Sequence, residues 1–233
     1  INRLKDLVPS MVGGSADLAP SNKTEMKGEG FFSVDDRSGR NIHFGVREMA
    51  MTAITNGIYL HGGLKPFCAT FFVFSDFMKP MIRLAALMGL PVAYVFTHDS
   101  IGVGEDGPTH EPVEQLSMLR SIPNLNVFRP ADYTETAVAW ASAMKSEATP
   151  TAIVLTRQNL PQLEGSSQDA FKGGYILEEA SNKNNIDLIL MASGSEVELA
   201  VNAKAELEKA GKSVRVVSIP CMSIFDAQDA AYK

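Results

Sequence analysis

Short apolar runs alternate along this chain with longer segments in which apolar residues recur every three or four positions. The short runs are typical of buried strands, and the longer segments are typical of amphipathic helices. Their regular alternation predicts an α/β fold: a parallel sheet with helices on both faces, in three α/β/α layers. The expected strands are Met11–Gly14, Ile42–Phe44, Pro66–Ala69, Val92–Thr97, Asn126–Arg129, Ala152–Thr156, Leu188–Ala192 and Val214–Ile219.

Two helices are predicted from apolar spacing and two from their starts. The first spans Gly45–His61, with a buried stripe made of Val46, Met49, Ala50, Ala53, Ile54, Gly57 and Ile58. The second carries Phe74, Phe77, Met78, Met81, Ile82 and Ala85 on one face. Asp132 with Glu135, and Ser195 with Glu198, have the spacing of capping boxes, which start helices. Gly211 is expected to end the last of these helices.

A polar stretch with glycines at its end, residues 166–174, indicates a domain linker. Residues 1–165 then form the first domain. Residues 175–233 form the start of a second α/β domain, which we expect to be truncated because strand, helix, strand is too little sheet. The chain starts at Ile1 and stops in a helix-like run without a stop signal, which predicts a fragment of a longer protein.

Composition excludes several classes of function. The net charge is −6 and the sequence has no basic cluster, which argues against nucleic acid or an anionic membrane as the main partner. No apolar run approaches the ~20 residues of a membrane span. The two cysteines are far apart in sequence, so we expect a reducing, cytoplasmic setting rather than a disulfide framework.

Polar and aromatic residues follow most of the expected strands of the first domain. They are Ser15 and Asp17, Arg47 and Glu48, Phe71 and Phe74, His98, and Arg157. In a parallel sheet these strand ends share one edge, which is where open α/β sheets bind ligands. The alternation therefore predicts a binding or catalytic edge.

The segment from Thr97 to His110 is the strongest candidate for chemistry at that edge. Long irregular segments inside compact domains are usually functional. His98, Asp106 and His110 can exchange hydrogen bonds with hydroxyl groups, and histidine can move protons near neutral pH. A capped turn with structural histidines is equally compatible with the pattern alone.

The same loop satisfies a dinucleotide-binding pattern through Gly102, Gly104 and Gly107. Its acidic residues would face a pyrophosphate, and Pro108 and Pro112 delay the helix that should hold the phosphates. We therefore rank a nicotinamide site low. A metal site is also disfavoured, because the acids lack a recognisable ligand spacing.

The other candidates each have a structural and a functional interpretation. Glu48 opens a helix and could simply complement the helix dipole. It could instead be a carboxyl group pressed among Phe44, Val46 and Met49, kept protonated by desolvation. Phe71, Phe74 and Phe77 could be core or could stack on a cofactor ring. Arg157 could pair on the surface or clamp a phosphate, and Ser21 could be a turn residue or a phosphate donor.

Five segments together resemble the transketolase family: residues 13–22, 44–48, 97–110, 157–162 and 194–200. The resemblance runs from about Met11 to the end of the chain, and its motifs are long. Related thiamine enzymes share the fold and a helix-opening glutamate. They are not expected to share the Gly-Glu-Asp-Gly-Pro-Thr-His loop or the Arg-Gln-Asn stretch.

The resemblance implies an activity, cofactors and partners. Transketolases move a two-carbon ketol unit from a ketose phosphate to an aldose phosphate in the pentose phosphate pathway. They use thiamine diphosphate and a divalent metal, Mg²⁺ or Ca²⁺, and are homodimers with active sites at the subunit interface. The first domain would be the pyrimidine-binding domain, and the second the beginning of the C-terminal domain.

Site roles follow from the resemblance as well. Glu48 would hydrogen-bond the aminopyrimidine and promote its imino form. Phe74 would stack on the pyrimidine, with Phe71 and Phe77 around it, and Asp17 would line the cofactor pocket. His98, Asp106 and His110 would bind sugar hydroxyls or move protons, and Ser21 and Arg157 would hold the sugar phosphate.

Three departures from the family pattern stand out. Phe77 replaces a frequent tyrosine, and Glu111 replaces the usual glutamine. The chain also lacks the Gly-Asp-Gly segment that, in the family, belongs to the domain holding the diphosphate and the metal. We therefore expect no metal ligands in this chain and no activity from it alone. A non-catalytic dimerisation or ligand-binding module of the same fold is the alternative.

Overall fold

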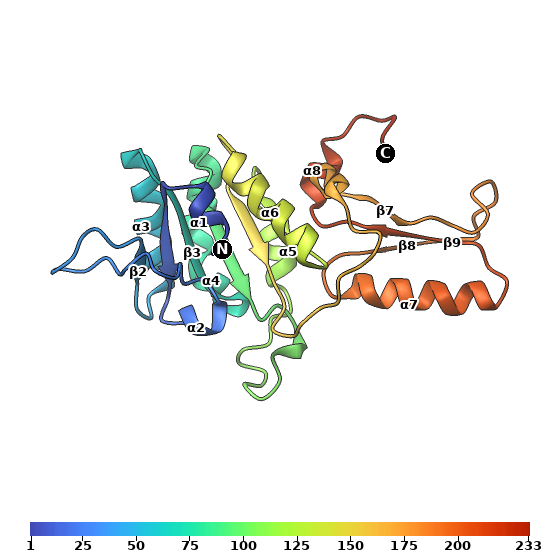
Figure 1. Ribbon diagram of the computed structural model, residues 1–233, viewed down its shortest axis with the longest axis horizontal. Helices are drawn as coiled ribbons and strands as arrows, with labels where there is room; N and C mark the ends of the chain where they lie inside the picture. Colours follow the sequence, from blue (N-terminus) through green and yellow to red (C-terminus); the bar gives the residue numbers. More distant parts are fainter. The chain divides into compact units, whose positions relative to one another are not determined.

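A computed structural model describes all residues from Ile1 to Lys233, and Figure 1 labels its helices and some of its strands. The chain forms two compact units. The first combines Ile1–Leu125 with Ala143–Arg157, and the second combines Asn126–Ser142 with Gln158–Lys233. The domain linker predicted at residues 166–174 does not coincide with a boundary between these units, and it stays a prediction.

The larger sheet has six strands in the order β2-β1-β3-β4-β6-β5. They are β1 (Met11–Ser15), β2 (Asn41–His43), β3 (Lys65–Phe71), β4 (Ala93–Thr97), β5 (Asn126–Phe128) and β6 (Thr151–Val154). The pairs β1–β2, β1–β3, β3–β4 and β4–β6 are all parallel. The predicted α/β class is confirmed, and each predicted strand lies within two residues of an observed one.

Strand β1 lies between β2 and β3 and requires glycine at positions 13 and 14. A Cβ atom on Gly14 would lie 1.8 Å from the carbonyl oxygen of Ile42, and one on Gly13 would lie 2.2 Å from that of Phe67. Side chains at these positions would collide with backbone on both sides of the strand. The glycine pair therefore allows β1 to sit between β2 and β3.

Helices flank the strands of the first unit. They are α1 (Leu4–Leu7), α2 (Ala19–Asn22), α3 (Glu48–His61), α4 (Ser75–Met88) and α5 (Gln115–Arg120), with short 3₁₀ turns at Phe72–Phe74 and Ile101–Val103. Helix α6 (Tyr133–Lys145) follows β5. Helices α3 and α4 pack against each other (Figure 1), and α4 continues through Pro80.

The predicted buried stripe of α3 is wrong. Its buried residues are Glu48, Met51, Thr52, Thr55 and Asn56. Within the predicted stripe, Val46, Met49 and Ile54 are 77%, 50% and 48% exposed. The polar face packs inward because its groups are satisfied: the Thr52 and Thr55 hydroxyls donate to backbone carbonyls one turn earlier. The apolar face of α3 is thus left outside.

Helix α4 follows its prediction more closely. Met78, Ile82 and Ala85 are buried, as expected. Phe77, by contrast, is 58% exposed. It lies beside the exposed face of α3, and both contribute to the cavity described below.

The second unit contains a three-stranded sheet in the order β7-β9-β8. Its elements are β7 (Tyr175–Glu178), β8 (Leu188–Ala192), α7 (Glu196–Lys209), β9 (Val214–Ser218), α8 (Met222–Asp226) and a 3₁₀ turn at Gln168–Lys172. Strand β8 is parallel to β9 and β7 is antiparallel. Strand β7 was not predicted. The helix start predicted at Ser195 is confirmed, because α7 begins at Glu196. Its capping box is wrong, because the Ser195 hydroxyl donates to the Glu196 side chain and does not cap the helix.

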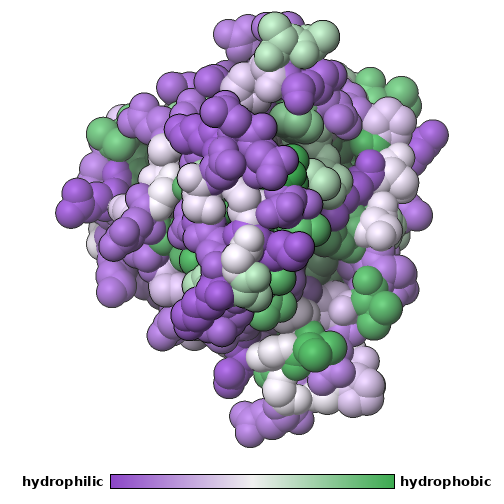
Figure 2. All heavy atoms as spheres, turned by 90° about the vertical axis from the view of Figure 1, so that its right-hand side faces the viewer, coloured by the Kyte–Doolittle hydropathy of each residue, from purple (hydrophilic) through white to green (hydrophobic).

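One face of this small sheet is covered and the other is open. Helix α7 packs along β8 and β9 (Figure 1), and Val214 and Val216 are buried. Ile189 and Met191, on β8, are 50% and 68% exposed and line a cavity of about 420 Å³. Figure 2 shows hydrophobic side chains gathered in a hollow between hydrophilic ones on the side of the molecule it presents.

A buried carboxyl group organises the core of the second unit. Glu135 Oε1 accepts hydrogen bonds from the Tyr175 hydroxyl at 2.9 Å and the Ser218 hydroxyl at 2.6 Å. Its Oε2 accepts from the Ala131 N–H at 2.7 Å, and the Glu135 N–H donates to Asp132 Oδ1 at 3.0 Å. The predicted helix start at Asp132 is thereby confirmed. Burial raises the pKa of the Glu135 carboxyl, and the hydrogen bonds it accepts oppose that rise.

Candidate functional site

The carboxyl ends of the first four strands lie at one edge of the large sheet. Ser15, the last residue of β1, pairs with His43 on β2 and with Ala69 on β3. Phe71, the last residue of β3, pairs with Thr97, the last of β4. The predicted convergence of strand ends is confirmed, so the residues that follow these strands occupy a common rim.

Two predicted site residues at this rim have left-handed backbone conformations. Asp17, two residues after β1, has a φ of 61°, and His98, directly after β4, has a φ of 63°. Side chains with a Cβ rarely adopt such values, and they cluster at functional sites. The conformation of His98 accompanies a close stack of its ring on Phe71, with 3.8 Å between ring centroids.

The two histidines of the loop share one aromatic platform, which we define as Phe71, Phe74 and Phe77. The His110 ring lies edge-on to Phe71 and Phe74, with centroid distances of 6.4 and 5.4 Å. Phe71 stacks with Phe74 and Phe74 with Phe77, each at 6.3 Å. Phe71 is buried, Phe74 is half-buried and Phe77 is exposed. Because the platform is partly open, the interpretation of these three rings as core alone does not hold.

Burial favours the neutral form of His98, and the charges around it act in both directions. Burial lowers the pKa of His98, and the nearby Arg157 guanidinium lowers it further. Asp106 and Asp99 raise it, and His110 lowers it. Arg157, Asp106 and His110 therefore all lie close enough to His98 to act on its charge.

A chain of buried hydrogen bonds lies behind His98. The Thr97 hydroxyl is 2.6 Å from Asn22 Oδ1 and 2.9 Å from His98 Nδ1. Asn22 Nδ2 in turn donates to Ser15 Oγ at 2.8 Å. We did not predict a role for Asn22 or Thr97 from the sequence. Their contact joins positions 75 residues apart, and the only local signal was their place next to Ser21 and His98.

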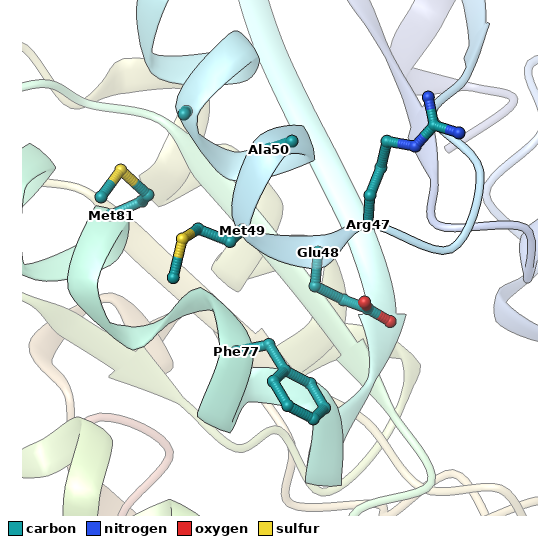
Figure 3. Close-up of a pocket in the computed structure, with 7 residues that line it drawn as sticks. Arg47, Glu48, Met49, Ala50, Phe77 and Met81 are labelled. Carbon is teal, nitrogen blue, oxygen red and sulfur yellow. The ribbon is translucent and has the colours of Figure 1, made fainter.

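Glu48 lies at the start of α3 beside an open cavity of about 520 Å³. The cavity is lined by Arg47, Glu48, Met49, Ala50, Ala53, Phe77 and Met81. In Figure 3 the Arg47 side chain points away from Phe77, while the Glu48 carboxylate lies on the side of the Phe77 ring. Glu48 is 8% exposed, and Thr70 Oγ1 donates to its Oε1 at 3.3 Å. Phe77, one ring of the aromatic platform, lines the same cavity as Glu48, so the carboxyl group adjoins the platform there.

The surroundings of Glu48 differ in part from the prediction. Phe44 is buried as expected, but Val46 and Met49 are exposed and do not cover the carboxyl group. The neighbouring residues of its own helix therefore do not enclose Glu48 in an apolar environment. The exposed residues leave Glu48 next to an uncovered apolar surface.

The remaining candidates are exposed residues at the same rim. Ser21 lies in α2, Asp17 follows β1, Asp106 lies in the loop after β4, and Arg157 follows β6. Their roles toward cofactor, sugar and phosphate stay predictions. Ser21 directly precedes Asn22, which places it beside the hydrogen bonds behind His98.

The structure weakens the dinucleotide-binding interpretation of the loop. Helix α5 begins only at Gln115, and the glycine-rich loop itself contains just the 3₁₀ turn Ile101–Val103, so no α-helix opens there to receive a pyrophosphate. No cluster of three or more His, Cys, Asp or Glu side chains is arranged to hold a metal ion. No helix has both the length and the apolar character of a membrane span.

Two protein families match this chain. Residues 1–162 match the family described as "Transketolase, pyrimidine binding domain". The chain belongs to the transketolase family. Residues 173–233 match the "Transketolase-like TK C-terminal domain", so both parts of the transketolase resemblance are confirmed.

Individual transketolases are similar to this chain in sequence over its whole length. The chain is 61% identical to a transketolase of Halalkalibacterium halodurans and 58% identical to that of Bacillus subtilis. In both cases all of this chain is covered, together with 35% of the relative. The chain thus spans about a third of the length of the curated relatives it matches.

Solved transketolase structures confirm the fold. A Pichia stipitis transketolase in complex with sedoheptulose 7-phosphate matches with a TM-score of 0.96 and 49% identity, over 100% of this chain and 35% of that one. A split-gene transketolase, described as an inactive β4 tetramer, matches with a TM-score of 0.74 and 28% identity. That match covers 94% of this chain and 68% of the split-gene chain.

Proposed function

We propose that this chain supplies one half of a transketolase active site, which transfers a two-carbon ketol unit from a ketose phosphate to an aldose phosphate. The observation that carries the proposal is the shared platform: His98 and His110 both contact Phe71, beside the strand residue that bonds Glu48. The site thus combines a flat apolar surface, a buried carboxylate and two imidazoles. These groups suit a flat heterocycle and a polyhydroxylated substrate.

The residues fit the pyrimidine ring of thiamine diphosphate. Phe74 and Phe77 are open enough to contact a flat ring, and Glu48 lines the adjoining cavity, where it can hydrogen-bond a ring nitrogen. When bound, this cofactor supplies the carbon to which the two-carbon unit is temporarily attached. Asp17 would border the same pocket. The diphosphate and a divalent metal, Mg²⁺ or Ca²⁺, would be held by residues outside this chain.

The polar residues of the rim would handle the sugar phosphates. His98 and His110 would bind sugar hydroxyls and move their protons, because an imidazole ring can accept and donate hydrogen bonds. Asp106 would accept a hydrogen bond from a hydroxyl. Ser21 and Arg157 would hold the phosphate, the latter as a two-pronged guanidinium.

We place this activity in the cytoplasm, in the pentose phosphate pathway, and in a homodimer with its active site at the subunit interface. The exposed apolar face of α3 supports the dimer. This face, Val46, Met49, Ile54 and Leu60, is 48–77% exposed and adjoins the Glu48 cavity. Apolar surface of this kind, next to a functional group, is typical of protein interfaces.

Replacing Ile54 with aspartate is expected to weaken the dimer about hundredfold, because a carboxylate would be buried without a partner. Sedimentation velocity of the full-length protein measures the change. Ile54→Val is the matched control and should leave the dimer intact. A wild-type protein that is monomeric, or an aspartate variant that dimerises normally, would contradict the interface.

The activity itself is tested with the full-length protein. After removal of bound cofactor and metal, transfer from xylulose 5-phosphate to ribose 5-phosphate should require both thiamine diphosphate and a divalent metal. The 233-residue chain assayed alone should show none. Cofactor-independent transfer by the full-length protein, or activity from this chain alone, would contradict the proposal.

A further inference from the structure

The hydrogen bonds behind His98 constrain where its proton lies. The Thr97 hydroxyl has a single hydrogen and two neighbours, Asn22 Oδ1 at 2.6 Å and His98 Nδ1 at 2.9 Å. An amide oxygen can only accept, so the hydroxyl hydrogen points to Asn22. The Thr97 oxygen is then left to accept, and Nδ1 of His98 must carry a proton to donate to it.

The Asn22 amide is itself held from the other side. Its Nδ2 donates to Ser15 Oγ at 2.8 Å, and its backbone N–H donates to the Leu18 carbonyl. Ser15 Oγ also accepts from the Leu18 N–H at 3.3 Å. Ser15, Asn22, Thr97 and His98 are all buried, so water does not compete readily for these bonds.

We infer that Asn22 and Thr97 are positioning residues that hold His98 in the Nδ1–H tautomer, with the Nε2 lone pair directed to act as an acceptor. This inference deepens the proposed function and rests on it for its consequence. In the proposed site, an acceptor at Nε2 can take a hydrogen bond or a proton from a sugar hydroxyl. The opposite tautomer would present a donor and could not.

His110 offers an internal comparison. It too follows a threonine whose hydroxyl is 2.9 Å from its Nδ1. Thr109 is exposed, however, and its hydroxyl is free to donate to the ring, because it makes no second side-chain bond such as the one between Thr97 and Asn22. The Thr97–His98 pair therefore fixes the tautomer of its histidine, whereas the Thr109–His110 pair leaves both tautomers of its histidine open.

Because burial favours the neutral form of His98, the choice between its two tautomers matters. Burial and Arg157 both lower the pKa of His98, while Asp106 and Asp99 raise it and His110 lowers it. A neutral ring has one donor and one acceptor nitrogen, and the partner of one nitrogen decides the role of the other. The stack on Phe71 fixes the plane of the His98 ring. The hydrogen bond at Nδ1 then determines which tautomer the ring adopts.

Neutron diffraction from crystals of the full-length protein tests the tautomer directly. We expect deuterium on Nδ1 of His98, on the Thr97 hydroxyl toward Asn22, and on the Asn22 nitrogen toward Ser15. Deuterium on Nε2 alone, with the Asn22 amide turned the other way, would overturn the inference. This result is independent of activity, so it separates the inference from the proposed function.

Kinetics of ketol transfer test the consequence. Thr97→Val keeps the shape of the side chain and removes the hydroxyl, and should lower kcat/KM on the order of tenfold, the effect of one lost orienting hydrogen bond. Thr97→Ser should restore activity to within about twofold, and Thr109→Val should have the smaller effect of the two valine variants. If the tautomer is as inferred but Thr97→Val is fully active, the acceptor role of His98 in the proposed function fails. If Thr97→Ser does not rescue activity, the positioning role is overturned.

Discussion

Replacement of Glu48 with alanine in the full-length protein is expected to lower kcat for ketol transfer on the order of 10²–10⁴-fold, the range for loss of an acid–base group. Glu48 is buried at the edge of the cavity and bonds Thr70 at 3.3 Å. This is its only side-chain hydrogen bond, so the loss of folding free energy should stay within about 1 kcal/mol. Steady-state kinetics and thermal unfolding of the same samples measure both quantities.

The control for this experiment separates chemistry from helix stabilisation. Glu198 also lies in the first turn of a helix, α7, but it is exposed and belongs to the second unit. Glu198→Ala removes the same favourable interaction with a helix dipole, and should leave kcat unchanged. Normal turnover in Glu48→Ala, or equal losses in the two variants, would remove the assigned role of Glu48.

Replacement of Glu135 with alanine is expected to lower the free energy of unfolding by about 3 kcal/mol, because three buried donors lose their acceptor. These donors are the Tyr175 hydroxyl, the Ser218 hydroxyl and the Ala131 N–H. Trp140, the single tryptophan, is buried on α6 one and a half turns away, so its fluorescence follows urea unfolding of this part. Tyr175→Phe removes one donor and should cost about 1 kcal/mol.

The effect of Glu135 should also depend on pH. Burial raises its pKa in the folded state above the ordinary value of 4.5. The folded protein then holds this proton more tightly than the unfolded chain. The stabilisation from Glu135 is fully present below pH 4.5 and declines as pH rises through the folded-state pKa.

Glu135→Ala should therefore cost more stability near pH 4.5 than at pH 7. Glu206→Ala, which changes an exposed carboxylate paired with Lys209 on α7, should change little and without this trend. A cost that grows from pH 4.5 to pH 7 would contradict the direction of the shift.

Much of the fold follows from local pattern. The strand Ala93–Thr97 lies within and just after an unbroken apolar run, Pro91 to Phe96, so its position and the edge at which it ends were both predictable. The aromatic residues and histidines that follow the strands were identified for the same reason. Strand β7 was missed because its four residues pair with β9, some 40 residues later, and pairing at that range leaves little local pattern.

The face of α3 shows why pattern can mislead. Apolar spacing indicates which helix face avoids water, but not which surface covers that face. In α3 the sheet receives polar residues, and Asn56 accepts from the buried Tyr94 hydroxyl at 2.7 Å. The apolar face is left exposed beside Glu48. Contacts such as Thr97 to Asn22 are likewise invisible in sequence, because they depend on which strand ends become neighbours.

The central claim is that the loop after β4 and the end of β3 build one site around Phe71. The most direct test is a double-mutant cycle in the full-length protein, with His98→Ala, His110→Ala and the pair, measured as kcat/KM for ketol transfer. If both imidazoles act on one substrate, the double variant should lose clearly less than the product of the two single losses, with a coupling of at least ~1 kcal/mol. Losses that multiply independently would place the two histidines in separate roles and contradict the account.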